Sequence, residues 1–436
     1  MRAVFGLVAV FMTIAVPLAT PAPAPSHTPA PAPAPSTSDS VYIVVTTGAI
    51  QAEAVADRYG VTARHTYSTA LHGFSATMTA EQAGSLLRDP AVAYVQRSIA
   101  HHLTDTQSGP PSWGLDRVDQ RALPLDSAYT YPSDAASVHA YVIDTGVRTT
   151  HADFGGRAES GFDAIDGGPA DDCHGHGTHV AGTIAGTAHG VAKAARVVAV
   201  RVLDCAGGGT TETVLAGVDW LAANVRKPAV ANMSLGGGPD PALDDGVRRA
   251  IASGITFALS AGNGSGGEPR PACNQSPARV GEALTVSATD RDDARARWAN
   301  TGGCVDLFAP GVGIMSAWGA SDDATRSLSG TSMAAPHVTG AAALYLAEHP
   351  EATPPEVAAA VIAAATPGAV RDPLDGSPNL LLHIGDAVPI CPPTTPGPPP
   401  SPSPSLSPTP SPSPSVTPSP DPTASPSASP SASPGR

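Results

Sequence analysis

The sequence predicts an α/β protein whose main domain is a doubly wound parallel sheet, preceded by a small α+β domain. Segments typical of strands and of helices alternate over residues 107–386. The strand segments are continuously apolar, as expected for strands that helices cover on both faces. Polar side chains follow one strand and open two helices, which is where α/β sheets place their chemistry. One parallel domain accounts for all three observations.

The elements of this main domain are expected to alternate between strand and helix over most of its length. Apolar runs predict strands at Val138–Ile143, Arg196–Leu203, Ala229–Leu235, Thr256–Ala261, Leu284–Ala288 and Val305–Phe308. Helices are expected at Gly177–Gly186, Thr211–Asn224, Pro241–Ser253, Ser332–Glu348 and Pro354–Ala364. A dinucleotide-binding fold is the rival architecture, but no strand is followed by the Gly-x-Gly-x-x-Gly turn and acidic partner that it needs.

The smaller domain is expected over residues 41–103. Its elements are strands at Val41–Val45, Gly73–Thr79 and Val92–Arg97 and helices at Ile50–Tyr59 and Ala80–Leu87. This is a βαββαβ-like order, which forms a small open-faced sandwich. By itself the order fits any ferredoxin-like module.

The two ends of the chain have compositions that do not predict a core. Residues 1–24 combine a basic residue, the apolar run Val4–Leu18 and small-residue cleavage sites, the pattern of a secretory signal peptide. A retained membrane anchor is the alternative, although the run is shorter than the roughly 18–20 residues that span a bilayer. Residues 25–40 are expected to form a Pro/Ala linker, and residues 391–436 are expected to form a disordered Pro/Ser-rich tail. The tail is either a cell-wall spacer or a segment lost during maturation.

The charge and cysteine content restrict the possible partners. A formal net charge of −14 argues against nucleic acid or an anionic membrane as the main partner. After the first 24 residues, no stretch is long and apolar enough to span a bilayer. The chain has five cysteines, an odd number for a secreted protein.

Three polar residues at strand and helix ends have the chemistry of a catalytic triad. Asp144 ends a strand, His176 lies in a glycine-flanked cluster that opens a helix, and Ser332 opens another helix after Gly330. Free N–H groups and the dipole at a helix N-terminus favour a developing oxyanion. A base must take the serine proton, a carboxylate must orient that base, and Asp…His…Ser is a known triad order. Pro336 is tolerable there because a missing N–H costs little near a helix start.

The local sequences around these residues closely resemble the signature blocks of the subtilases, the subtilisin-like serine proteases. The blocks are Asp144-Thr145-Gly146, His176-Gly177-Thr178-His179 and Gly330–His337. Within the family the resemblance is closest to the proteinase K branch, especially to aqualysin-like secreted proteases. The stretches that carry this are Trp113–Gln120, Asn232–Gly238 and Asn274–Val280. The resemblance covers about residues 41–385.

The resemblance implies a secreted serine endopeptidase that hydrolyses protein substrates with broad specificity through an Asp-His-Ser triad and an acyl-enzyme. It implies that residues 41–103 are an inhibitory propeptide of a self-processed zymogen, with the junction near Ala100–Gln107. It assigns the oxyanion-binding amide to Asn263. Two segments resemble the glycine-rich edges that hold an extended substrate, namely Ser234, Leu235 and Gly236, and Gly207, Gly208 and Gly209. For the second segment, a flexible loop is the alternative.

The resemblance also implies two disulfides. In aqualysin-like proteases, cysteines at the corresponding positions pair as Cys173 with Cys205 and Cys273 with Cys304. Cys391 is then left without a partner at the start of the tail.

Structural calcium is the cofactor that the resemblance implies, and no organic cofactor is expected. One calcium loop would use Asp116, Asp119, Gln120 and Asp126. A second site would use Asp306 with carbonyls near Gly281 and Ala283. Hard oxygen ligands suit calcium, and solvated surface acids are the alternative interpretation.

A zinc-dependent hydrolase is a different functional hypothesis. His174, His176 and His179 could bind zinc, because His-x-x-His on a helix places two imidazoles on one face. The cluster lacks the glutamate of metalloproteases, and it would leave Asp144 and Ser332 without roles. His179 is therefore interpreted as a structural histidine.

A non-catalytic binding or wall protein with a subtilase-like shape is the other alternative. The complete set of triad residues and Asn263 argues against a decayed site. We expect protein and peptide substrates and the chain's own propeptide as partners, with no nucleic acid and no membrane. We further expect a monomer in the extracellular space, with the tail as a possible link to the cell wall.

Overall fold

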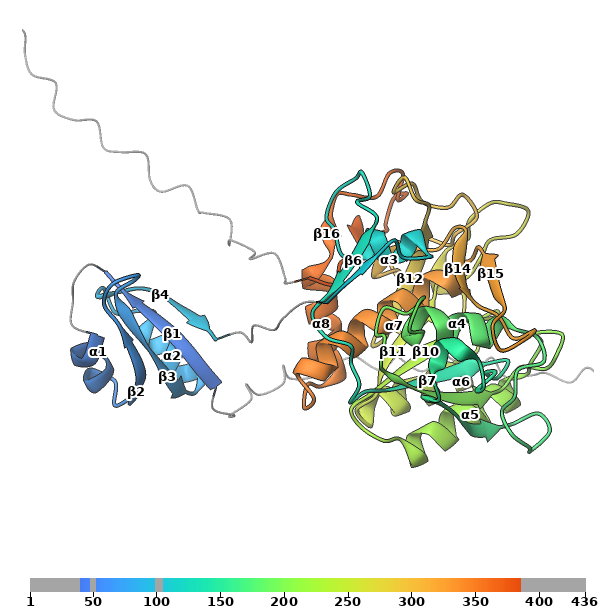
Figure 1. Ribbon diagram of the computed structural model, residues 1–436, viewed down its shortest axis with the longest axis horizontal. Helices are drawn as coiled ribbons and strands as arrows, with labels where there is room; N and C mark the ends of the chain where they lie inside the picture. Colours follow the sequence, from blue (N-terminus) through green and yellow to red (C-terminus); the bar gives the residue numbers. More distant parts are fainter. Residues whose placement is uncertain (1–39, 48–51, 99–104, 386–436) are drawn as a thin grey trace, which may run out of the picture.

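The computed structural model describes residues 40–47, 52–98 and 105–385 (Figure 1). The expected signal peptide at 1–24, nearly all of the linker at 25–40, and the tail with Cys391 lie outside the described residues. Most of the expected propeptide junction lies outside them as well.

The small domain consists of β1 (Ser40–Thr46), α1 (Ala52–Arg58), β2 (Ala63–Tyr67), β3 (Gly73–Met78), α2 (Ala80–Leu86) and β4 (Val92–Arg97). These strands form an antiparallel sheet in the order β2-β3-β1-β4. Val44, Phe74 and Leu86 are fully buried in a core that the sheet shares with both helices. The βαββαβ order is present. β2 is largely exposed and has no apolar alternation, which is why the sequence pattern does not mark its bounds.

A nine-stranded sheet forms the centre of the main domain, in the order β16-β17-β13-β12-β11-β10-β7-β9-β8. Its strands are β7 (His139–Asp144), β8 (Ala158–Asp163), β9 (Arg196–Arg201), β10 (Ala229–Met233), β11 (Thr256–Ser260), β12 (Leu284–Thr289), β13 (Leu307–Pro310), β16 (Thr366–Pro367) and β17 (Leu380–Leu381). Only β16 and β17 pair antiparallel. The chain builds β8 and β9 on one side of β7 and β10 to β13 on the other. Such a reversal opens a crevice at the carboxyl ends of the central strands.

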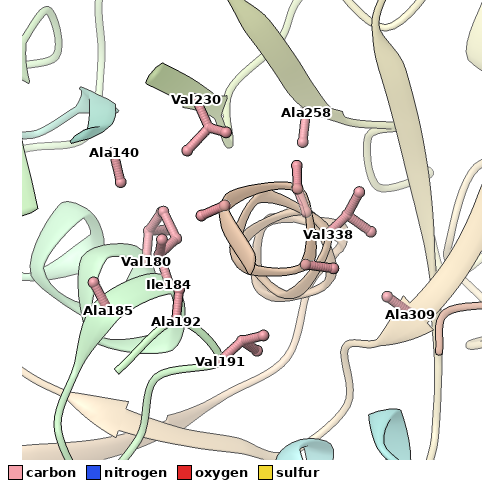
Figure 2. Close-up of a cluster of buried hydrophobic side chains, with 14 of the residues drawn as sticks. Ala140, Val180, Ile184, Ala185, Val191, Ala192, Val230, Ala258, Ala309 and Val338 are labelled. Carbon is pink, nitrogen blue, oxygen red and sulfur yellow. The ribbon is translucent and has the colours of Figure 1, made fainter. Parts of the chain in front are cut away.

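Helices cover both faces of this sheet, as alternate residues of β7 demonstrate. Ala140 and Val142 share a buried cluster with α4 (His176–Ala185), α7 (Thr331–Glu348) and α8 (Pro354–Ala364). Tyr141 and Ile143 share another with α5 (Thr211–Asn224) and α6 (Pro241–Ala252). Figure 2 shows Val338 of α7 surrounded by side chains from α4 and from several strands. The start of α7 is therefore held at the centre of the domain.

The expected strands and helices are present with ends that shift by a few residues. The strand expected at Val305–Phe308 is displaced and runs as β13, Leu307–Pro310. Short elements without apolar periodicity are additional: β5 (Asp105–Ser108), α3 (Trp113–Val118), β6 (Ala128–Tyr131), β14 (Ile314–Ala317), β15 (Thr325–Leu328) and the single turns η1 (Ala152–Phe154) and η2 (Ala272–Asn274). Within the described ranges, no helix combines the length and apolarity needed to cross a bilayer.

Candidate active site

Asp144 and His176 meet at the carboxyl end of β7. Asp144 Oδ1 lies 2.7 Å from Nδ1 of His176, and it also accepts the N–H of Thr145 at 2.8 Å. The Asp144 side chain is fully buried. A carboxylate in this position orients the imidazole and favours a proton on Nδ1, so that Nε2 can accept another proton.

Gly175 allows His176 to reach this position. His176 is the first residue of α4, and Gly175 precedes it with φ of 105°, in the left-handed region that favours glycine. A Cβ atom on Gly175 would lie 2.5 Å from the ring of Trp318. The missing side chain therefore lets the start of α4 pack closely against the indole.

The pKa of His176 is raised above its ordinary value. Burial disfavours the imidazolium, but the charge of Asp144, the hydrogen bond to it and the charge of Asp172 together outweigh burial. The site therefore stabilises the cation that forms when His176 takes up a proton.

Ser332 is the second residue of α7, after the cap residue Gly330 and Thr331. Its Oγ donates to the Ser234 carbonyl at 3.2 Å, rather than to His176. Ser332, His176 and Asn263 nevertheless line one hollow of about 400 Å³. Catalytic hydrogen bonds are often loose before substrate binds, and a hydroxyl can change its acceptor by rotating about the Cα–Cβ bond.

Asn263 lines the same hollow, and its amide oxygen is held by Thr331. Its Oδ1 accepts the N–H of Thr331 at 3.0 Å and the Thr331 hydroxyl at 3.1 Å. Because the N–H of Thr331 needs an acceptor, the atom that faces it is the amide oxygen, and the other end of the side chain is the amide nitrogen. The amide nitrogen lies 3.7 Å from an ideal Cβ position on Gly330, beside the start of α7, where the N–H of Ser332 has no intrahelical acceptor.

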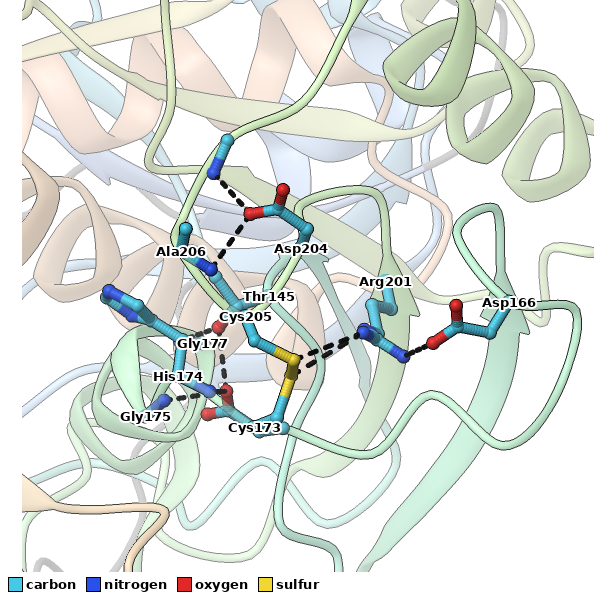
Figure 3. The surroundings of a disulfide bond; sticks show 12 residues. Thr145, Asp166, Cys173, His174, Gly175, Gly177, Arg201, Asp204, Cys205 and Ala206 are labelled. Atoms are coloured by element: carbon cyan, nitrogen blue, oxygen red, sulfur yellow. Dashed lines mark hydrogen bonds and ion pairs between the residues drawn. A yellow bond between two sulfur atoms is a disulfide. The ribbon is translucent and has the colours of Figure 1, made fainter.

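The two expected substrate-binding segments line a second hollow of about 730 Å³, which His176 also lines. Gly207, Gly208 and Gly209 contribute to it together with Ser234, Leu235 and Gly236. The Asp204 carboxylate accepts the N–H groups of Ala206 and Gly208 at 2.9 Å each (Figure 3). The segment 207–209 thus begins in a hydrogen-bonded turn.

Two disulfides join the cysteines of the main domain. Cys173 is bonded to Cys205, and Cys273 is bonded to Cys304. The first ties the approach to α4 to the loop of the second hollow, and Arg201 packs beside it (Figure 3). The bonds close loops with sequence separations of 32 and 31 residues, which stabilises the fold by about 3–4 kcal/mol each on a chain-entropy estimate.

The residues of the first expected calcium loop lie between α3 and β6. Asp116 accepts the N–H groups of Asp126 and Ser127, and Gln120 Oε1 also accepts that of Asp126. Asp119 Oδ1 is buried and has no hydrogen-bond partner. Burial chiefly, with the charges of Asp126 and Asp116 added, raises the pKa of Asp119 to about 6. An unpartnered buried carboxylate oxygen among other acids fits a hard cation.

The second expected calcium position centres on Asp306. One of its oxygens accepts the N–H of Thr285 at 2.7 Å, and burial raises its pKa to about 6. Across the described ranges, no three His, Cys, Asp or Glu side chains gather closely enough to hold a metal ion. Calcium at either expected position would therefore need carbonyl or amide oxygens besides the carboxylates.

The histidine cluster does not turn its rings to a common point. His179 is fully buried, and its Nε2 lies 3.0 Å from the carbonyls of Ile314 and of Arg326. Burial lowers the pKa of His179 to about 4. Its ring thus links α4 to β14 and β15, while His176 faces Asp144.

Asp172 is a site residue that the sequence patterns did not single out. Its carboxylate accepts the hydroxyl of Thr145 at 2.9 Å, the N–H of Gly175 at 2.7 Å and the N–H of Thr178 at 2.9 Å. It thereby joins the residue after Asp144 to the first turn of α4. The only signal in the sequence is a carboxylate four positions before His176, without periodicity.

Comparison with known proteins agrees with this geometry. Residues 138–385 match the model of the subtilase family, and residues 32–104 match that of peptidase inhibitor I9. An extracellular serine proteinase of Thermus sp. (strain Rt41A) is 53% identical over 318 residues, which are 73% of this chain and 76% of the relative. Alkaline serine exoprotease A of Vibrio alginolyticus is 48% identical over 331 residues, 74% of this chain but only 61% of that relative.

A solved structure is also similar. The crystal structure of a cold adapted subtilisin-like serine proteinase matches with a TM-score of 0.60 and 52% sequence identity. The match covers 63% of this chain and 98% of that structure.

Proposed function

The chain belongs to the subtilase family, and from this we propose that Asp144, His176 and Ser332 are its catalytic triad. It is a serine endopeptidase, synthesised with an I9 inhibitor domain as a zymogen. The observation that carries the residue assignment is the 2.7 Å contact between Asp144 and His176 beside the hollow that Ser332 lines.

The first step is attack by Ser332 Oγ on the carbonyl carbon of the scissile peptide bond. His176 Nε2 takes the hydroxyl proton, and Asp144 stabilises the imidazolium that results. The raised pKa of His176 supports this role, since the cation is favoured once formed. The same proton then passes to the leaving amine, and water hydrolyses the acyl-enzyme by the reverse sequence.

The tetrahedral oxyanion would be held by Asn263 and by the N–H of Ser332. Both donors lie at the start of α7, where the helix dipole adds to them. The Asn263 carbonyl oxygen accepts two hydrogen bonds from Thr331, which leaves its amide nitrogen available as a donor to the oxyanion.

The substrate would lie extended between the segment 207–209 and the segment 234–236. Glycines on both edges let a peptide backbone approach closely enough for ladder hydrogen bonds. Such bonds read the main chain rather than side chains, so we expect broad endopeptidase specificity.

Labelling of the mature enzyme with a fluorophosphonate tests the assignment. We expect one modified serine, Ser332, found by peptide mapping, with parallel loss of casein hydrolysis. Hydrolysis that survives stoichiometric labelling, or that a zinc-selective chelator abolishes in the presence of calcium, would contradict the triad.

We extend the proposal to maturation and location. The small domain would block the cleft until the chain cuts itself within 100–107, and β5 begins at Asp105 and pairs with β6 in the main domain. This favours a cut just before Asp105.

One relative is named as an extracellular proteinase, and we propose the same location for this chain. The enzyme would be a monomer, and residues 391–436 would link it to the cell wall.

Subtilases generally bind structural calcium, and we propose that this chain does so at two positions. Asp116, Asp119, Gln120 and Asp126 would hold one ion together with backbone carbonyls, because the three carboxylates alone do not gather around one point. The unpartnered Oδ1 of Asp119 supports this proposal. Asp306 with the carbonyls of Gly281 and Ala283 would hold another. The role is stability alone, because neither group lines the hollow that Ser332 and His176 share.

A further inference from the structure

The hollow that Ser332 and His176 line also reaches the exposed side chain of Arg326. Beyond Ser332 it is lined by Trp318, Arg326 and Leu328, none of which lines the hollow of the glycine-rich segments. The two hollows meet at His174 and His176, which line both of them. When the acyl side of a substrate occupies the larger one, the residues after the scissile bond enter the smaller one.

Arg326 is held firmly at the wall of this smaller hollow. It lies in β15, opposite Ser316 of β14, and its carbonyl accepts the Nε2–H of His179 at 3.0 Å. Its guanidinium stands over the ring of Trp318, 4.5 Å from the ring centre. Such a cation–π contact fixes the plane of the guanidinium without using its N–H donors.

The charge of Arg326 has no acidic partner among the described residues. Asp322, in the turn between β14 and β15, pairs with Arg148 at 2.7 Å and also accepts the hydroxyl of Thr150. Asp172, on the approach to α4, is occupied by hydrogen bonds from its own loop. A free, oriented guanidinium thus faces the leaving-group side of the cleft in a chain of net charge −14.

We propose that Arg326, stacked on Trp318, selects an acidic side chain at the first or second residue after the scissile bond. This inference rests on the proposed function, since it assumes that Ser332 is the nucleophile. A guanidinium fork matches a carboxylate with two parallel N–H donors, whereas a lysine at the same substrate position would be repelled. The acyl side of the substrate would be held through its main chain, which leaves specificity on that side broad. The selection therefore concerns the substrate residues that follow the scissile bond.

The test uses internally quenched peptides that share one acyl side and carry Glu, Gln or Lys at the two positions after the scissile bond. For the wild-type enzyme at low salt we expect kcat/KM to be about two- to tenfold higher with Glu than with Lys, and Gln to be intermediate. High salt should reduce the ratio, because the charges are exposed.

Three variants complete the test. Arg326→Gln should remove the preference, and Arg326→Glu should reverse it. Arg248→Gln on α6 removes one positive charge outside the hollow and should leave the preference intact. An anilide substrate, which carries no charge after the scissile bond, should be hydrolysed by every variant, which shows an intact triad.

Equal kcat/KM for the Glu and Lys peptides with the wild-type enzyme would overturn the proposal. So would a preference that persists in Arg326→Gln. Failure of the wild-type enzyme to cleave any peptide or the anilide would instead contradict the proposed function.

Discussion

The Ser234 hydroxyl donates to the Ser332 carbonyl at 2.8 Å, in place of the helical N–H that Pro336 lacks. α7 begins at Thr331, so Pro336 lies in its second turn. In the second turn, the missing N–H of Pro336 removes a helical hydrogen bond. The expectation that a proline at this position costs little stability is therefore wrong. Asn232 donates to the Ser234 hydroxyl at 2.9 Å, so the polar end of β10 replaces the bond and fixes the backbone of the nucleophile.

Ser234→Ala tests this substitution of donors. Loss of one buried hydrogen bond costs about 0.5–1.5 kcal/mol, so we expect kcat to fall about two- to tenfold and the melting temperature to drop. Adding Pro336→Ala should restore a helical N–H to the Ser332 carbonyl and recover part of both quantities. If Pro336→Ala lowers kcat and the melting temperature further, the Ser234 hydroxyl and a helical N–H are not interchangeable donors. Melting is followed with a serine-directed inhibitor bound, which prevents autolysis.

Asp172→Asn should change the pH profile of the enzyme. The charge of Asp172 contributes to the raised pKa of His176, and the base must be neutral to accept the serine proton. Removing that charge lowers the pKa, so the acidic limb of kcat/KM should move to lower pH while the plateau decreases.

The matched control for this profile is Asp171→Asn, which changes the exposed neighbouring carboxylate. Its acidic limb should stay near that of the wild type. A limb that is identical in all three proteins would show that Asp172 has a structural role only.

Asn263→Ala should lower kcat by about 10²–10³, the usual effect of losing one oxyanion donor, with little change in KM. The substituted residue also loses its bond to the N–H of Thr331. Asn263→Asp keeps an acceptor for that N–H but lacks the donor, so it should be as slow as the alanine variant. Wild-type turnover in the aspartate variant would refute the oxyanion role.

Ser332→Ala should leave a precursor that is not cut near Ala100–Gln107. The step is intramolecular and needs the nucleophile, whereas the change hardly disturbs packing. His176→Ala should behave likewise, and Asn263→Ala should only slow the cut. Intact-mass analysis of variants purified free of other proteases measures this. Maturation of Ser332→Ala at the wild-type rate and position would mean that another protease activates the chain.

Calcium removal should lower the melting temperature of the Ser332→Ala protein. The half-buried carboxylates of Asp119 and Asp306 would lose their counter-charge with the proposed ion, and magnesium should substitute poorly because it demands octahedral geometry. Asp119→Asn should reduce the calcium response more than the control Asp171→Asn. An unchanged melt after exhaustive chelation would remove both sites.

Much of this molecule could be predicted from local sequence. Strands β7 and β9 to β13 are apolar runs covered on both faces, and their helices carry the matching apolar residues, so hydrophobic pattern predicted the layered α/β fold. The edge strand β8 and the short strands β16 and β17 lack a long buried apolar run, and the pattern did not predict them. Asp144, His176 and Ser332 each occupy a strand or helix end that short motifs mark. Cys173 and Cys205 were paired through family resemblance, and the structure bonds them.

Other features arise only when distant segments meet, because they depend on contacts between residues far apart in the chain. The role of the Ser234 hydroxyl depends on the carbonyl of Ser332, which lies 98 positions away in the chain and which Pro336 leaves without a helical hydrogen bond. Asp172 acts by joining the end of β7 to the start of α4. The charge of Arg326 becomes a selective feature only because Trp318 holds it at the cleft and no described carboxylate neutralises it. Local pattern determined the elements and the reacting groups, while tertiary packing decided which polar groups are satisfied, which are left free, and where they point.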